Sequence, residues 1–168
     1  YDNASGLLFI SAANRRQGGQ APEGIYRLNV KNDTQPILVG TDFAGEFHPH
    51  GLSLFRQDSI LYLLVVNHSK SGDFIESFSY YDDFLYHIRT YSYAKLCCPN
   101  DVVAVGTDKF YVTNDHGSKS GIRRIIEDYL RIPQSNVFYF DGVGFEKAAG
   151  PFHYANGVNV SPDRKHLY

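Results

Sequence analysis

A degenerate repeat of roughly fifty residues constrains the fold of this chain more than any other feature. Its copies begin at His50, Asn100 and Asn156, so their first residues lie 50 and 56 positions apart. Each copy opens with a polar residue, continues as a short apolar strand, turns at an Asp-containing loop and re-enters a strand at an aromatic residue. We therefore predict a pair of antiparallel strands in every copy.

More strand candidates lie between the copies. They cover residues 24–30, 73–80, 84–89 and 136–140, and residues 6–11 resemble the back half of an earlier copy. Apolar and polar residues alternate imperfectly in them, which is typical of half-buried strands. Four strands per period predict the blade of a β-propeller. We expect one all-β domain over residues 1–168, a partial β-propeller of roughly three blades, truncated and unpaired at both ends.

One segment departs from the strand pattern. Between Gly121 and Arg131 the apolar residues recur at spacings of three and four, which predicts a short amphipathic helix that ends before Pro133. In a strand-rich chain this helix is an insertion. It could form a lid or a partner surface, or it could cover the edge of a blade.

Charge and hydropathy argue against two classes of partner. The formal net charge of −2 gives no broad basic surface for nucleic acid. The longest mostly apolar run, Ile60 to Val66, is too short to cross a bilayer. The adjacent Cys97 and Cys98 are expected to be reduced, partly buried thiols, because neighbouring cysteines rarely bridge each other. Their spacing does not resemble a zinc site.

The polar residues that open the repeats are the first candidates for chemistry. In a propeller the equivalent loops surround one channel, so His50, Asn100 with Asp101, and Asn156 would face the same axis. Oxygen ligands without cysteines or clustered histidines suit Ca²⁺. Alternatively, Asn and Asp open strands because their side chains cap turns. The residues alone leave both interpretations open.

Histidines form a second group of candidates. His48 and His50 flank Pro49, His68 follows an apolar strand, and His116 ends the segment that begins at Thr113. A histidine beside a metal-bound carbonyl or water can act as a general base, and His50 and His68 could relay that proton. The alternative is a purely structural role. No Gly-x-Ser-x-Gly elbow supplies a serine nucleophile, so an activated water fits better.

Five segments in order resemble the serum paraoxonase/arylesterase family over nearly the whole chain. They are His48-Pro-His-Gly-Leu-Ser, Tyr62-Leu-Leu-Val-Val-Asn-His, Asn100-Asp-Val-Val-Ala-Val-Gly, Tyr111-Val-Thr-Asn-Asp-His and Ala155-Asn-Gly-Val-Asn-Val-Ser-Pro-Asp. The resemblance implies a six-bladed β-propeller with one catalytic and one structural calcium ion in its central tunnel. It also implies hydrolysis of lactones and aryl esters, and some members of the family also hydrolyse organophosphates.

The resemblance implies roles for individual residues. Asn100 and Asn156 would ligate the catalytic calcium, which polarises the substrate carbonyl. Asp101 and the backbone carbonyl of Leu52 would hold the structural calcium. His50 would be the general base, with His68 behind it.

The same resemblance implies that parts of the site lie outside this sequence. The family's Glu-Asp ligand pair would precede Tyr1, and Asp2 does not substitute for it. Its Asp-Asn pair would follow Tyr168, and the cysteines of its terminal disulfide are not covered either. We therefore expect incomplete calcium shells here, and we expect this stretch alone to bind calcium weakly and to be inactive.

The sequence thus favours a calcium-dependent carboxylic ester hydrolase acting on small esters or lactones. The alternatives are a gluconolactonase-like or strictosidine-synthase-like propeller and a non-catalytic propeller scaffold. In the family, the segment matching residues 121–131 lies over the active-site mouth, and the resemblance implies contact of this helix with a membrane or lipid surface. Four glycosylation sequons, at Asn3, Asn32, Asn67 and Asn159, favour an extracellular or secretory-lumen glycoprotein.

Overall fold

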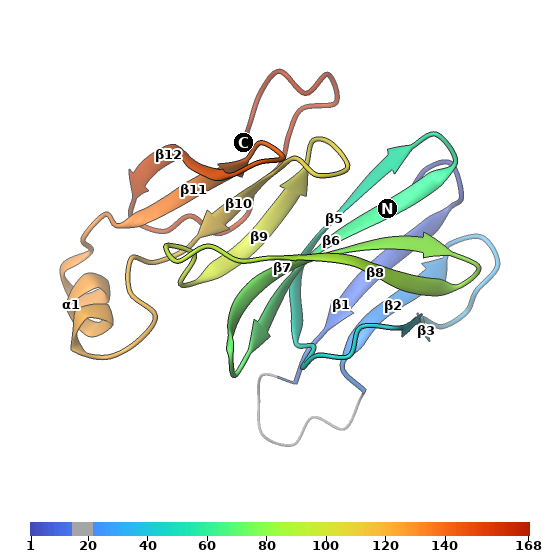
Figure 1. The fold of residues 1–168 in the computed structure, drawn as a ribbon, viewed down its shortest axis with the longest axis horizontal. Helices are drawn as coiled ribbons and strands as arrows, with labels where there is room; N and C mark the ends of the chain where they lie inside the picture. Colours follow the sequence, from blue (N-terminus) through green and yellow to red (C-terminus); the bar gives the residue numbers. More distant parts are fainter. Residues whose placement is uncertain (15–21) are drawn as a thin grey trace.

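A computed structural model describes residues 1–14 and 22–168, which form three sheets and one helix (Figure 1). The first sheet contains β1 (Leu7–Ala12), β2 (Gly24–Asn29) and β3 (Ile37–Leu38). The second contains β4 (Gly40–Thr41), β5 (Pro49–Gln57), β6 (Ile60–Ser69), β7 (Gly72–Tyr81) and β8 (Phe84–Tyr91). The third contains β9 (Pro99–Ala104), β10 (Phe110–Asn114), β11 (Ser135–Phe140) and β12 (Phe145–Phe152). The all-β prediction with one helix, α1 (Ile122–Leu130), is confirmed.

In each sheet one edge is formed by its first long strand, which is β1, β5 or β9. The orders are β1-β2-β3, β5-β6-β7-β8-β4 and β9-β10-β11-β12, antiparallel except where β4 pairs with β8. Strand β5 contacts both β1 and β9. The Ser11 hydroxyl donates to the His50 carbonyl, and the Ala104 amide donates to the Ser53 hydroxyl (3.0 Å). The sheets do not close into a ring over the described residues.

Strand β6 explains why the chain has a continuous apolar run. Successive side chains of a strand point to opposite faces, so both of its faces must be covered for such a run to be buried. Leu61, Leu63 and Val65 pack in a core shared with the first sheet. Leu64 and Val66 pack in a second core shared with the third sheet. The run from Leu61 to Val66 therefore sits between two layers.

Two of the three repeat copies form the predicted strand pairs. The copy at His50 gives β5 and β6, joined at Asp58, whose φ is 54°; the copy at Asn100 gives β9 and β10. The third copy was predicted wrongly as a strand pair. It is reduced to a single antiparallel bridge between Val160 and Leu167.

Some strands were not predicted from the sequence. Strand β12 contains Lys, Ala and a Gly150-Pro151 step, which are poor strand formers, and it is accommodated because it lies at the edge of its sheet. Strands β3 and β4 have two residues each, too few to show a period. Asn159, predicted in a buried strand, is exposed and outside any strand.

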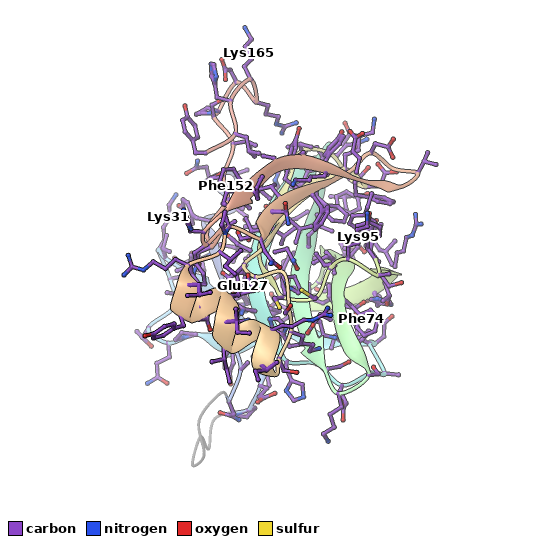
Figure 2. All side chains as sticks on the ribbon, turned by 90° about the vertical axis from the view of Figure 1, so that its left-hand side faces the viewer. Lys31, Phe74, Lys95, Glu127, Phe152 and Lys165 are labelled. Carbon is purple, nitrogen blue, oxygen red and sulfur yellow. The ribbon has the colours of Figure 1, made fainter. Side chains whose placement is uncertain are left out.

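Helix α1 has its apolar side on the outside. Figure 2 looks onto the end of the molecule that carries it, with Glu127 labelled. Glu127 is its one buried residue, 3% exposed. The apolar residues that predicted the helix are all exposed, at positions Ile122, Ile125, Ile126, Tyr129 and Leu130. Among the described residues the helix therefore does not use its apolar side to cover a sheet edge, which was one of the two predicted roles.

The boundaries of α1 follow from its end residues. Gly121 precedes it with a φ of 82°, and Arg131 ends it in the left-handed conformation, two residues before Pro133. No helix in the described ranges is long and apolar enough to span a bilayer.

Candidate functional site

A pocket of about 400 Å³ lies where β6 ends and β9 begins. Strand ends from two sheets and the segment after β10 meet there, so residues distant in sequence share its wall. The residues with polar side chains in this wall include His50, His68, Asp73, Asn100, Asp115 and Lys119. Cys97 and Cys98 also line it. The predicted pair His50 and His68 thus shares a cavity with the predicted calcium ligand Asn100.

Strand pairing brings the two predicted catalytic histidines together. Pro49 of β5 is paired with Asn67 of β6 in an antiparallel ladder, so His50 and His68 flank this pair on the two neighbouring strands. The amide of His68 donates to the carbonyl of His48 (3.2 Å). As a result, the ring centroids of His50 and His68 are 5.4 Å apart, with an interplanar angle of 60°.

Asp73, which the sequence did not single out, orients His68. The Nδ1 of His68 lies 2.8 Å from Asp73 Oδ1, and Lys119 Nζ lies 2.7 Å from Asp73 Oδ2. Burial opposes ionisation of Asp73, but the contacts with His68 and Lys119 outweigh it and lower the pKa of that carboxyl. The ionised carboxylate accepts the Nδ1 proton, which leaves the Nε2 lone pair of His68 free to accept another.

His50 has an unusual local environment. Its Nδ1 is buried and has no hydrogen-bond partner among the described residues. Buried polar atoms are nearly always paired, so an exception often marks a functional group or a missing partner. Among the described residues, His50 is the one histidine with a ring nitrogen that is both buried and unpaired.

Two of the other histidines, His116 and His87, are held by structural contacts. His116 is 4% exposed and lies between Asp115 (2.7 Å) and Asp128 of α1 (2.8 Å). His87 lies 2.9 Å from the buried Glu76. These contacts agree with a structural role, including for His116, which had been a candidate for proton transfer.

A second cluster, of oxygen atoms, forms where β5 crosses close to β9. A Cβ placed on Gly51 would lie 2.5 Å from the Asn100 carbonyl oxygen and 2.8 Å from Asp101 Oδ1. Only glycine permits this approach, and it sets His50 and Leu52, the neighbours of Gly51, beside Asn100 and Asp101. The Asp101 carboxylate also accepts from the Val158 amide (3.0 Å).

Thr113 connects this cluster to the third repeat copy. Thr113 is buried in β10. The hydroxyl lies 2.6 Å from the Asn156 carbonyl oxygen and accepts from the Asp101 amide at 3.0 Å. The backbone of Asn156 is thereby fixed near Asp101, while Asn156 itself is exposed. Sequence reasoning missed Thr113 because its role depends on contacts across three segments.

The donor chemistry of this cluster fits part of a calcium shell. Calcium takes six to eight oxygens from carboxylates, amides and carbonyls. Asp101 offers a carboxylate, Asn100 and Asn156 offer amides, and Leu52 offers a backbone carbonyl. The amide nitrogen of Asn100 lies 3.4 Å from Asp115 Oδ2, so its oxygen is the end left for a cation. In the described part of the chain, no three His, Cys, Asp or Glu side chains converge on a metal position.

Asp2 has a different partner. Its two carboxylate oxygens accept from Arg56 Nε (3.0 Å) and Nη2 (2.6 Å), and its Oδ2 also accepts from Ser5. These bonds, led by the one from Arg56, lower the pKa of Asp2. Asp2 therefore anchors the N-terminal segment on β5.

The two cysteines are free and partly buried, as predicted. Their Sγ atoms are 3.3 Å apart. The hydrogen bond that Cys98 donates lowers the pKa of Cys97 to about 6. The same contact raises the pKa of Cys98.

Comparison with known proteins places the chain in a family. The arylesterase family model matches residues 9–168. The chain is similar to serum paraoxonase/arylesterase 2 of Gallus gallus (37% identity) and to serum paraoxonase/arylesterase 1 of Mus musculus (38%) and Homo sapiens (34%). Each alignment covers 98% of this chain and 50% of the relative, so the chain spans about half the length of these relatives. The match extends through both halves of the site described above, and the chain belongs to the arylesterase family.

Proposed function

We propose that the full-length protein is a calcium-dependent hydrolase of aryl esters and lactones. Membership of the arylesterase family supports a hydrolase function, and the relatives are named as arylesterases. The observation that carries the proposal is the junction of β5 and β9 at Gly51. There, the oxygen donors of Asn100 and Asp101 adjoin the strand that carries His50.

The ligands divide between two ions. Asn100 and Asn156 would hold a catalytic calcium, and Asp101 with the Leu52 carbonyl would hold a structural one. Bound calcium would supply a Lewis acid that polarises the substrate carbonyl and stabilises the oxyanion. Thr113 would keep Asn156 in place, because its hydroxyl is bonded to the backbone of that residue.

The histidines would carry the proton. His50 faces the pocket and would accept a proton from the attacking water. His68 lies beside it and is held by Asp73, so it would take the proton onward. A carboxylate behind a histidine fixes its orientation and raises its basicity.

We also propose that the full-length chain closes into a six-bladed β-propeller. The contacts of β5 with both β1 and β9 support this arrangement, because the innermost strands of successive blades adjoin in a propeller. Blades outside this sequence would supply the remaining calcium ligands. On this account the 168 residues alone bind calcium weakly and are inactive.

The proposal is tested with ligand variants of the full-length protein. Asn100→Ala and Asn156→Ala should lower kcat/KM for phenyl acetate and for a δ-lactone by about 10²- to 10³-fold, the magnitude that follows when stabilisation of the oxyanion is lost. Lys165→Ala is the control, because Lys165 is exposed in the same C-terminal segment and lies outside the proposed sites. Equal activity in all three variants would contradict the assignment. A folded, calcium-binding protein without activity would favour a binding scaffold.

The outer side of α1 suggests what this helix contacts in the full-length protein. Exposed Ile122, Ile125 and Tyr129 form an apolar surface on a helix that also carries Arg123 and Arg124, a combination that suits the interface of a lipid layer. We propose that this side of α1 contacts a lipid surface.

Glycosylation in a secretory compartment is a further part of the proposal. The sequons at Asn3, Asn32 and Asn159 are exposed, whereas Asn67 is 1% exposed and its amide is bonded inside the fold. Removal of N-glycans from the secreted protein should change its mass at the three exposed positions and not at Asn67.

A further inference from the structure

Two neighbouring thiols on the wall of the candidate site are not used by the proposed reaction. Cys97 and Cys98 precede β9, line the same pocket as His50 and Asn100, and are partly exposed. Their Sγ atoms lie 3.3 Å apart. Cys97 and Cys98 lie in a bend outside any strand, so strand alternation does not fix their side chains and the close approach of the sulfurs needs a local cause.

Asn114 provides that cause. It is 2% exposed, and its amide group binds both cysteines: Oδ1 accepts from the Cys98 backbone amide (2.8 Å), and Nδ2 lies 3.5 Å from Cys97 Sγ. Cys97 Sγ also lies 3.3 Å from the His116 carbonyl oxygen. Arg124 of α1 lies 3.8 Å from Cys98 Sγ. The buried Asn114 side chain therefore holds the Cys97 thiol and the Cys98 backbone in place, and the two Sγ atoms meet on one side of the chain.

Direct bonding of the two sulfurs is geometrically unfavourable. Adjacent Cα atoms are about 3.8 Å apart across a trans peptide, shorter than the roughly 4.4–6.8 Å span of ordinary disulfides. An atom inserted between the sulfurs removes this conflict, because each sulfur then bonds to the inserted atom and not to the other sulfur. The arrangement thus favours a ligand that takes two thiols at once.

We propose that Cys97 and Cys98 form a dithiol site that chelates trivalent arsenicals on the wall of the candidate active site. An arsenic(III) oxide R–As=O reacts with both thiols, forming two As–S bonds while the two thiol protons and the oxide oxygen leave as water. Arsenic stays trivalent and both sulfurs keep their oxidation state, so no oxidant or reductant is required. The bound group would project into the pocket that holds His50 and His68.

The chelate has a distinguishing property. Two bonds to one ligand act together, so a monothiol competes poorly whereas a small dithiol competes well, through the effective concentration of the second thiol. Loss of ester hydrolysis on arsenical binding rests on the proposed hydrolase function, whereas binding of the arsenical itself does not. Arsenical retention and ester hydrolysis are therefore two independent tests.

The test uses the reduced full-length protein and phenylarsine oxide. Intact-mass measurement after incubation, followed by excess 2-mercaptoethanol, should show one retained phenylarsenic group, which 2,3-dimercaptopropanol removes. Cys97→Ser and Cys98→Ser should each lose that retained group, while thermal unfolding shows that both variants are folded. In an active preparation, ester hydrolysis should fall in proportion to occupancy and return after dimercaptopropanol.

Two results would overturn the proposal. One is release of the arsenical from the wild type by 2-mercaptoethanol as readily as from Cys97→Ser. The other is a retained group that persists in both serine variants, which would place it on other cysteines. An inactive protein that still retains the group at these cysteines would count against the hydrolase proposal and leave the dithiol site supported.

Discussion

Replacing Gly51 with alanine tests the close crossing of β5 and β9. The new Cβ would lie 2.5 Å from the Asn100 carbonyl oxygen and 2.6 Å from the Asp101 Cα, both backbone atoms. Ordinary contact begins near 3.4 Å, so the strands must separate by roughly 1 Å. Overpacking of this kind costs about 1–3 kcal/mol. The φ of Gly51 lies outside the left-handed region, so the cost is steric.

The measurement is urea unfolding of full-length Gly51→Ala, with Gly144→Ala as control. An m-value of about 1–3 kcal/mol per molar converts a loss of about 2 kcal/mol into a midpoint lower by roughly 1 M. Gly144 has no atom within 4 Å of its Cβ position, so its variant should unfold near the wild-type midpoint. Displacing the strands by 1 Å should also reduce ester hydrolysis by up to about 10²-fold. Equal midpoints and activities for the two variants would refute the argument.

Three further predictions concern the N-terminal anchor, the helix and the thiols. Asp2→Asn should cost about 1.5–3 kcal/mol of unfolding free energy at pH 7. Because folding lowers the pKa of Asp2, the difference from wild type should persist above about pH 4, the ordinary pKa of Asp, and shrink as the pH falls below it. Ile125→Asp with Tyr129→Asp should weaken binding to phosphatidylcholine vesicles by at least about tenfold, since two exposed apolar side chains are lost. Alkylation of Cys97 by iodoacetamide should be nearly as fast at pH 7 as at pH 9, because its pKa is about 6.

Each of these predictions has an outcome that would count against it. A pH-independent difference between Asp2→Asn and wild type would show that its charge is not the cause. For the helix, Arg123→Gln is the control, and equal vesicle binding by this variant and the double Asp variant would exclude the apolar side as the contact. An alkylation rate that climbs steadily from pH 7 to pH 9, and disappears in Cys97→Ser, would assign Cys97 an ordinary thiol pKa.

The sequence predicted the fold best where period and turn chemistry agree. The β5–β6 hairpin has an apolar run and a turn at Asp58, and the β7–β8 hairpin turns at Asp82 and Asp83, both with positive φ. Strand β12 was not predicted, because its residues are poor strand formers. It is a strand because it pairs with β11. Pattern alone also cannot tell which side of α1 faces outward.

The candidate site was predicted only in part, for a similar reason. Motifs identified His50, His68, Asn100 and Asp101 because these residues open or close strands. Asp73 and Thr113 were not recognised, because their roles depend on partners that only the tertiary structure brings near: His68 with Lys119 for Asp73, and Asp101 with Asn156 for Thr113. A side chain whose importance lies in its neighbours carries no signal of its own in one sequence.

Calcium removal from the full-length protein tests the central claim most directly. Hydrolysis of phenyl acetate would be followed in the untreated protein, after EDTA and dialysis, and after calcium is restored. The account predicts that activity is lost on chelation and returns with calcium, while Asn156→Ala stays low throughout. Full activity of the calcium-free wild type would contradict it.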